Sequence, residues 1–401
     1  MSKSSLALVS AITATVTMSS VAVAGAGVGP SVTDEGAQSA AVDRPAQPRL
    51  VVGPGDPIRN PLPEAERVEG RFLETGMCSS SIPGTVIDSE GKEHRVQLTA
   101  GHCVNQIESE QMPAVSTTIY APTKEHGDVR IGELGPHSFD LTGDSGEGWL
   151  PGLDGALNGD DWAFIILDDD IETSNVSYSR DEYGRNKGPG VQMEGIEDYS
   201  ELQRGEISFD NFAKPICKDG SRTGRSCGYQ IFRVRNGVWA VAMEMDQGDS
   251  GGNAYNPQNN HVIGVNSMAV AGIFYRVQPV DVAIEEAYGI EDGKVNEHFK
   301  VTDGTGDRSE TYRSIQDDQR FVMERRAQEQ IEQRRQQIEE VLPFELPESP
   351  ALPQLPQEVA DIPVPGFTNV DRVINDTISA ANNVHVAGQD LLQQAGVPSL
   401  F

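Results

Sequence analysis

The stretch RVQLTAGHC, residues 95–103, decides the fold class of this chain of 401 residues. Polar and apolar residues alternate from Arg95 to Ala100, and a period of two is typical of a strand with one buried face. The run WAFIIL, residues 162–167, is almost wholly apolar, as in a strand that is covered on both faces. Many short strands with turn residues between them predict an all-β body, folded as a sandwich or as barrels. Further β-prone runs lie at 230–235, 238–243, 261–265 and 273–277.

The alternating strand ends in a histidine, His102, next to Cys103. An imidazole held at the end of a strand can take a proton from a hydroxyl and return it later in the reaction. His102 is therefore the candidate general base. The six other histidines have no comparable context: His94, His126, His137, His261, His298 and His385.

The pentapeptide GDSGG, residues 248–252, carries the second chemical signal. A glycine before the Asp-Ser pair lets the chain turn, so that the amides of Gly248 and Ser250 converge on one point. Two such amides could donate to a developing oxyanion, and the glycines after Ser250 leave its hydroxyl uncrowded. Ser250 is the candidate nucleophile, with Gly248 and Ser250 as the oxyanion hole. The alternative is a glycine-rich surface turn, because short motifs also occur by chance.

A hydroxyl nucleophile and its imidazole base also need a carboxylate that orients the imidazole. Asp160 and Asp161 directly precede the apolar run at 162–167, so Asp161 would lie at the mouth of a buried strand. There it could accept the Nδ1 proton of His102 while shielded from water. We assign this role to Asp161 rather than Asp160, because a shift of one residue moves a side chain to the other face of a sheet.

His102, Asp161 and Ser250 follow one another in the order seen in chymotrypsin-like serine proteases, which this sequence resembles. The likeness is closest to the bacterial streptogrisin and α-lytic protease group. Residues 217–228 resemble the disulfide-closed loop of that group, and residues 274–289 resemble its final strand and helix. The resemblance implies a double six-stranded antiparallel β-barrel and a serine-type endopeptidase that works through an acyl-enzyme.

The same resemblance implies two disulfides and a buried ion pair. Four cysteines allow three pairings, and the pairing that suits this fold joins Cys78 to Cys103 and Cys217 to Cys227. A buried aspartate before the nucleophile needs a cation. The resemblance makes Lys218 the partner of Asp249. The rival is a new amino terminus at Val51, made by cleavage as in animal zymogens.

The resemblance also indicates residues that would bind substrate. Glu244, six residues before Ser250, stands where trypsin-like enzymes place an acid at the floor of the pocket, and it would favour Arg or Lys before the scissile bond. The alternative is an ordinary loop acid. Asp246 stands where the group usually has another cysteine, so we expect a different pocket shape. The strand that pairs with substrate backbone would comprise Ser267, Met268 and Ala269.

Charge and cysteine usage limit the candidate functions. The chain has 61 acidic and 31 basic side chains, a formal net charge of −30, which would repel phosphate backbones. We therefore expect protein or peptide substrates and no nucleic acid. Its hydrophobic fraction of 37% suffices for one sizeable core. No C-x-x-C motif occurs, so a zinc site is not predicted, and the proposed chemistry needs no metal or organic cofactor.

The first residues are typical of an export signal. Lys3 and the apolar stretch 6–23 precede a small-x-small site at Ala24, where we predict cleavage, with Ala26 as the other candidate. The alternative is a short membrane anchor, but the stretch is weakly apolar and lacks a basic stop. No later segment is long and apolar enough to span a bilayer. We expect a secreted, extracellular protein, a setting that favours disulfides.

Composition divides the rest of the chain into further segments. Residues 25–69 are rich in proline, glycine and alanine, and predict a propeptide or disordered leader, hence a zymogen. The charged tail after the body has a narrow apolar stripe, which favours a solvated helix over a coiled-coil partner. The predicted segments are a signal peptide at 1–24, the leader at 25–69, a trypsin-like serine protease domain at 70–300, a charged helical segment at 301–342, a Pro-rich linker at 343–366 and a C-terminal amphipathic segment at 367–401.

This long C-terminal extension leaves a second function open. A dense helix, a stiff spacer and an amphipathic end would suit docking to a cell-envelope partner. The alternative to an active enzyme is therefore an envelope-associated binding module on an inactive protease scaffold.

Overall fold

The alternating run is strand β7 (Glu93–Thr99), but its polar face is not open to solvent. Gln97 and Thr99 are fully buried, as are the apolar Val96 and Leu98. The Gln97 amide donates to Gly53 O at 3.2 Å and the Thr99 hydroxyl to Ser79 O at 2.9 Å. Neighbouring segments therefore cover both faces of β7, and its buried polar groups are hydrogen-bonded.

The computed structural model describes residues 50–62, 64–106, 114–140, 155, 157–270, 272–304, 308 and 311–339, all in one unit that begins at Pro48. The signal peptide, most of the leader, the Pro-rich linker and the C-terminal amphipathic segment that the sequence predicts lie outside these residues. None of the helices described is long and apolar enough to span a bilayer.

The first large sheet has eight strands and contains β7. Ser81, two residues beyond its last strand, donates its N–H to Leu98 O of β7 at 2.7 Å, so the far end of the sheet returns to β7. All its ladders are antiparallel. The strand order is β23 (Phe299–Val301), β6 (Pro83–Ile87), β7, β12 (Asp161–Leu167), β11 (Gly127–Phe139), β10 (Thr118–Thr123), β2 (Pro57–Pro61) and β5 (Thr75–Ser79).

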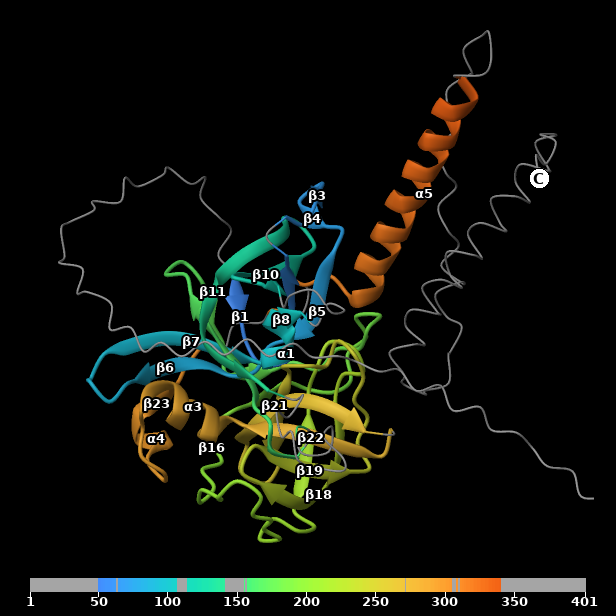
Figure 1. Ribbon diagram of the computed structural model, residues 1–401. Helices are drawn as coiled ribbons and strands as arrows, with labels where there is room; N and C mark the ends of the chain where they lie inside the picture. Colours follow the sequence, from blue (N-terminus) through green and yellow to red (C-terminus); the bar gives the residue numbers. More distant parts are fainter. Residues whose placement is uncertain are drawn as a thin grey trace, which may run out of the picture. The chain divides into compact units, whose positions relative to one another are not determined.

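The second sheet closes into a six-stranded antiparallel barrel, because its strands β21 and β22 also pair with each other. A short strand, β16, adds to β21 in parallel. Figure 1 shows these strands grouped below α1 in yellow and olive. The order is β16 (Gly195–Ile196), β21 (His261–Val270), β20 (Asn253–Asn256), β17 (Pro215–Lys218), β18 (Ser226–Val234), β19 (Gly237–Val241) and β22 (Phe274–Pro279). The predicted all-β class is confirmed: one of the two expected six-stranded antiparallel barrels is this closed barrel, and the other corresponds to the eight-stranded sheet.

Short pairs and helices complete the described fold. Two-residue strands pair as β1 (Val51–Val52) with β13 (Glu172–Thr173), β3 (Arg67–Val68) with β4 (Arg71–Phe72), β8 (Asn105–Gln106) with β9 (Ala114–Val115), and β14 (Val176–Ser177) with β15 (Val191–Gln192). The helices are α1 (Gly101–Val104), α3 (Val280–Tyr288), α4 (Val295–His298) and α5 (Ile315–Glu339).

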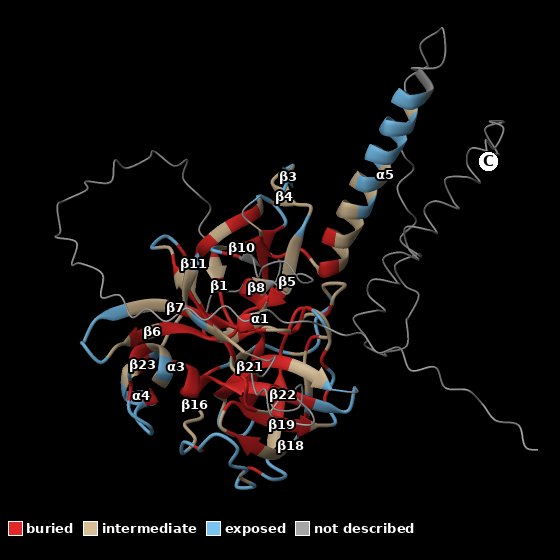
Figure 2. Cartoon of the chain, viewed as in Figure 1, coloured by how far each residue is buried: buried red, intermediate tan, exposed pale blue. Residues whose placement is uncertain are grey.

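Two apolar clusters support the sheets. The larger one includes Leu98, Phe164 and Ile284, so α3 packs with the first sheet. The smaller one fills the closed barrel and includes Val238 and Val277. Figure 2 shows buried residues along the strands of both sheets and a largely exposed α5.

The body begins earlier than the sequence indicates, and this corrects the leader predicted at 25–69. Strand β2 lies between β10 and β5, with Ile58 opposite Cys78 and Arg59 opposite both Met77 and Tyr120. Proline and glycine around this strand suggest a leader, but β5 and β10 hold it in the sheet on both sides.

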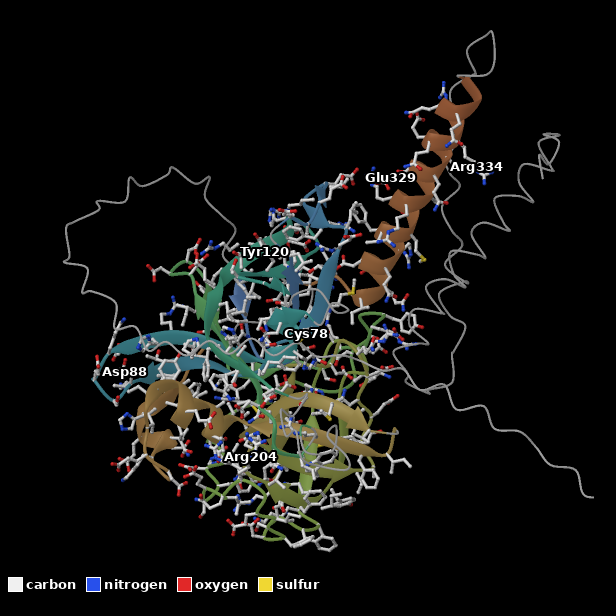
Figure 3. The ribbon with its side chains drawn as sticks, in the orientation of Figure 1. Cys78, Asp88, Tyr120, Arg204, Glu329 and Arg334 are labelled. Carbon is white, nitrogen blue, oxygen red and sulfur yellow. A yellow bond between two sulfur atoms is a disulfide. The ribbon has the colours of Figure 1, made fainter. Side chains whose placement is uncertain are left out.

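The body also ends later than the expected boundary at residue 300. Beyond it, Arg308, Tyr312, Arg313 and Asp318 are all buried. The guanidinium groups of Arg308 and Arg313 pair with Asp56 and Asp128, which lie far earlier in the chain. Along α5, residues 319–327 are mostly half-buried and residues 328–337 are mostly exposed, and Figure 3 shows charged side chains such as Glu329 and Arg334 along the exposed part.

Candidate active site

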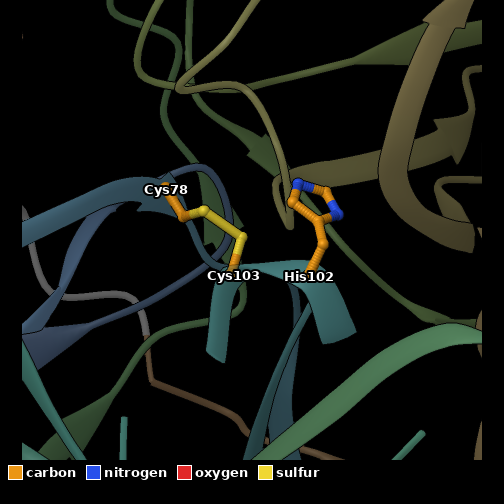
Figure 4. A group of neighbouring side chains, drawn as sticks. All are labelled: Cys78, His102 and Cys103. Carbon is orange, nitrogen blue, oxygen red and sulfur yellow. A yellow bond between two sulfur atoms is a disulfide. The ribbon is translucent and has the colours of Figure 1, made fainter. Parts of the chain in front are cut away.

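His102 lies in α1, the short helix that directly follows β7. The next residue, Cys103, forms a disulfide with Cys78. The backbone is closely packed at Gly101, where an added Cβ would come within 2.3 Å of Ser138 O. Figure 4 shows the imidazole on the same segment as this disulfide. The cluster of Cys78, His102 and Cys103 is no metal site, because both sulfurs are already bonded to each other. Both expected disulfides form, the second joining Cys217 and Cys227.

The imidazole of His102 is held by the carboxylate of Asp161, the first residue of β12. Nδ1 lies 2.9 Å from Oδ2 and 3.0 Å from Oδ1, and the backbone N–H of His102 also donates to Oδ1 at 2.8 Å. The Asp161 side chain is fully buried, while 24% of the His102 side chain is exposed. Desolvation lowers the pKa of His102, but the charge and hydrogen bond of Asp161 outweigh it, so the pKa is raised above its ordinary value.

A second layer of polar groups lies behind Asp161. The Ser267 hydroxyl donates to Asp161 Oδ2 and accepts from Arg276 Nη1 at 2.7 Å. Gln278 Oε1 accepts the backbone N–H of Asp161 at 3.1 Å. Burial by itself raises the pKa of Asp161, yet His102, Arg276 and Ser267 together hold it below its ordinary value. The carboxylate therefore stays ionised although it is out of contact with water.

The sequence analysis missed Arg276 and Gln278. Arg276 is fully buried, and burial lowers the pKa of its guanidinium to about 10, so it stays charged at neutral pH. Besides Ser267 it donates to the carbonyls of Gly159 and Asn236. The sequence contained a signal for Arg276, because an arginine inside the β-prone run at 273–277 is expected to be buried, and a buried charge needs a partner.

Ser250 reaches the same region from the closed barrel. Its carbonyl accepts the Ser79 N–H at 2.8 Å, and a Cβ at the next residue, Gly251, would lie 2.8 Å from Ala100 N. The serine backbone is thus close to the segment that carries His102. The described residues record no hydrogen bond between Ser250 Oγ and the imidazole. In proteins without substrate, such bonds are often long and tighten only when substrate binds.

The backbone around Ser250 has two free donors. The N–H groups of Gln247, Asp249, Gly251 and Gly252 all donate to nearby oxygens within the fold. Those of Gly248 and Ser250 have no acceptor among the described residues. Gly248 has a φ of +104°, which L side chains rarely adopt, and a Cβ there would meet Ile315 Cδ1 at 2.8 Å. The two amides expected to form the oxyanion hole are therefore the two left available.

The aspartate before the nucleophile has a buried partner. Lys218 Nζ lies 2.8 Å from Asp249 Oδ2, and both side chains are fully buried. Burial raises the pKa of Asp249, but Lys218 and Thr223 outweigh this effect and lower it. In the intact chain Val51 pairs with Glu172 between β1 and β13, and the cation beside Asp249 is Lys218.

The residues expected to bind substrate lie on β21 and in the loop after β19. Beyond the pair of Val265 with Asn253, β21 has no strand on its β20 side among the described elements, and Met268 and Ala269 pair only with β22. Glu244 is exposed, and its backbone exchanges hydrogen bonds with the Ser226 hydroxyl. Its pocket role stays a prediction of the sequence.

Solved structures similar to this chain are those of proteases. No family model matches the sequence, and no curated protein matches it significantly. Solved structures similar to the chain include the Nocardiopsis protease NAPase (17% identity, TM-score 0.34, 60% of this chain and 97% of that one) and Thermobifida fusca Protease A (14%, 0.35, 63% and 100%). A glutamic acid specific serine protease matches at 19% identity and a TM-score of 0.36, over 59% of this chain and 98% of that one. These neighbours are chymotrypsin-like serine proteases, and the function is argued below from the chain's own residues.

Proposed function

We propose that this protein is a serine endopeptidase, with Ser250 as nucleophile, His102 as general base and Asp161 as the orienting carboxylate. One observation carries the proposal: in the turn 247–252 only the amides of Gly248 and Ser250 lack an acceptor among the described residues. One of these amides belongs to Ser250 itself, and the next residue, Gly251, lies against Ala100, two residues before His102.

The proposed reaction begins with attack of Ser250 Oγ on the carbonyl carbon of a peptide bond. His102 Nε2 takes the hydroxyl proton, while Asp161 accepts the Nδ1 proton in a hydrogen bond and stabilises the imidazolium. The carbonyl oxygen becomes an oxyanion within reach of the Gly248 and Ser250 amides, each of which typically lowers the barrier by about 2.7–4 kcal/mol.

The intermediate then collapses and the C–N bond breaks. His102 gives its proton to the leaving amine, and an ester joins the acyl group to Ser250. Water attacks this ester, His102 takes one of its protons, and that proton returns to Ser250 as the carboxylic acid leaves. Each proton transfer in this reaction therefore has a named donor and a named acceptor.

The open side of β21 supplies the proposed substrate contact. An extended peptide could add along Ser267, Met268 and Ala269, where β20 has ended, because a free strand edge offers unpaired backbone groups. This placement would bring the peptide bond towards Ser250. Protein or peptide substrates are the chemistry that such an edge recognises.

Export from the cell is part of the proposal. Both disulfides form, and the sequence begins with a stretch typical of a cleavable signal. A tethering role of the C-terminal extension remains a separate hypothesis, which truncation of the exposed part of α5 and the residues after it would test.

Labelling with an organofluorophosphate tests the proposed nucleophile. The disulfide-bonded protein should gain one covalent adduct, located on Ser250 by peptide mass, and should show a burst of acyl-enzyme with an ester substrate. Ser250→Ala should abolish both, whereas Ser89→Ala, at an exposed serine remote from the site, should retain both. Correctly folded protein that is not labelled would contradict the proposal.

A further inference from the structure

Four carboxylates gather around α3, away from the proposed active site. Asp281 and Glu285 lie four residues apart on this helix and therefore share one of its faces. Asp198 comes from the loop after β16, and Asp292 from the loop after α3. One ligand oxygen each from Asp198, Glu285 and Asp292 lies within 4.8 Å of the others.

Backbone amides fix the three aspartates of this cluster. Each carboxylate accepts one N–H through one oxygen, which leaves the second oxygen for another partner. Asp281 Oδ2 accepts from Tyr199 at 2.8 Å, Asp198 Oδ2 from Val295 at 3.2 Å and Asp292 Oδ1 from Glu201 at 3.1 Å. Because Tyr199 directly follows Asp198, the bond to Tyr199 also holds Asp281 beside the Asp198 loop.

Three carboxylate oxygens of this cluster are buried and have no partner among the described residues. Asp198 Oδ1, Asp281 Oδ1 and Glu285 Oε1 are shielded from solvent and accept no hydrogen bond within the described residues. Asp281 as a whole is fully buried, and its charge is the largest electrostatic contribution that raises the pKa of Glu285 after burial itself. A buried carboxylate oxygen without a partner is costly, so something not yet identified must satisfy it.

Within the part of the chain that the structure describes, no basic side chain forms an ion pair with these four carboxylates. Among the ion pairs of the described residues, none includes Asp198, Asp281, Glu285 or Asp292. The nearby Arg235 pairs instead with Glu201 and Glu286. The cluster is thus an anionic, oxygen-only site without a cation of its own.

We propose that Asp198, Glu285 and Asp292 bind one calcium ion beside the buried Asp281, and that this ion ties α3 to the loops on either side of it. Calcium prefers six to eight oxygen ligands, carboxylates above all, at about 2.4 Å. Oxygens up to 4.8 Å apart can therefore touch one shared ion. Magnesium fits less well, since it demands near-ideal octahedral geometry and retains several waters.

Calorimetric titration with CaCl2 tests this site on the full, disulfide-bonded chain after removal of metal by a chelator. We expect one ion per chain, with a Kd in the range of about 10⁻⁴–10⁻³ M or tighter that extracellular calcium sites show. A hundredfold excess of calcium over Kd should raise the melting temperature by about 5 °C or more.

Charge-removing variants of equal size show whether these carboxylates bind the ion. Asp198→Asn and Glu285→Gln should each weaken calcium binding about tenfold or more, and should reduce the thermal shift accordingly. Both keep the size of the side chain and remove a carboxylate that has no ion-pair partner among the described residues, so neither should be less stable than the wild type in chelator. Glu286→Gln, on the same helix but paired with Arg235, is the matched control and should bind calcium as the wild type does.

Two results would overturn the proposal. One is no calcium binding by the folded wild type at up to about 10 mM, above the weakest extracellular sites. The other is unchanged binding by Asp198→Asn and Glu285→Gln. If Asp198→Asn fails to fold, Asp292→Asn at the exposed end of the cluster provides the same comparison. None of these measurements depends on peptidase activity.

Discussion

Asp161 and Arg276 are joined through one hydroxyl, that of Ser267, which donates to the carboxylate and accepts from the guanidinium. All three side chains are buried. The positive charge favours the ionised form of Asp161 and at the same time disfavours the imidazolium of His102. The orienting carboxylate therefore has its own counter-ion, independent of the histidine that it orients.

Substitution of Arg276 by glutamine should change the pH profile as well as the rate of the proposed enzyme. Removal of the guanidinium removes a charge that lowers the pKa of His102, so the midpoint of kcat/KM against pH should move upward. Arg233→Gln is the matched control, because Arg233 lies in the same barrel and pairs with Asp210. If both variants lose rate with an unshifted midpoint, Arg276 is only structural.

The pH dependence of the wild type should follow His102. Its raised pKa predicts that kcat/KM increases with pH through a midpoint above 6.5, because only neutral imidazole can accept the Ser250 proton. Asp161→Asn should lower that midpoint and the rate together, since the carboxylate is what raises the pKa. Initial rates with a peptide substrate across the pH range provide the measurement. A wild-type midpoint below 6.5 would contradict the geometry.

The same pKa shift has a consequence for stability, with a defined sign. A histidine with a raised folded pKa contributes stability that is fully present below its unfolded pKa of about 6.5 and is lost as pH rises through the folded pKa. The melting temperature of His102→Gln should therefore fall further below that of the wild type at about pH 5.5 than at about pH 8.5. An equal difference at both values would show that the pair contributes no pH-dependent stability.

Loss of Lys218 should damage the fold more than loss of a surface charge. Lys218→Met leaves Asp249 buried without its cation, and breaking a buried pair in this way costs about 3–5 kcal/mol. The matched control is Lys214→Met, since Lys214 is exposed just before the same strand. Denaturant unfolding of both variants measures the difference, which equal stabilities would disprove.

The end of the protein body can be located by truncation. A chain that ends at Glu339 keeps Arg308, Arg313 and Asp318, whereas a chain that ends at Asp307 loses their pairs with Asp56, Asp128 and Arg59. We expect the shorter chain to be less stable than the longer one by about 3 kcal/mol or more, because three buried charges lose their partners. Thermal unfolding of the two truncated chains gives the comparison, and similar melting temperatures would place the boundary before residue 308.

Several features of the structure are readable from local sequence. The alternation before His102 and the apolar run after Asp161 identify β7 and β12, which pair with each other directly. Placement of Asp161 rather than Asp160 also agrees with the structure, in which Asp161 contacts His102 and Asp160 accepts from Ser138 and Asn236. The alternation located β7 correctly, although neighbouring segments cover both of its faces and its polar residues Gln97 and Thr99 are buried.

Other features were hidden because their partners are remote in sequence. The segment that contains β2 looks like a leader, since its prolines and glycines resist regular structure, yet β5 and β10 hold β2 in the sheet on both sides. Arg308 and Asp56 are 252 residues apart, and each looks like an ordinary surface charge until the other is beside it. The carboxylate cluster on α3 is equally invisible, because two of its four members come from separate loops.

The amino-acid sequence alone determined the all-β class, the chain order of His102, Asp161 and Ser250, and the glycine-rich turn at 248–252, because each depends on neighbouring residues and their periodicity. Only the tertiary structure decided which charges are buried, where the body starts and stops, and which amides around Ser250 remain free. Burial and pairing are properties of segments brought together from distant positions, and the free energy of a charge depends on that environment rather than on its neighbours in the chain.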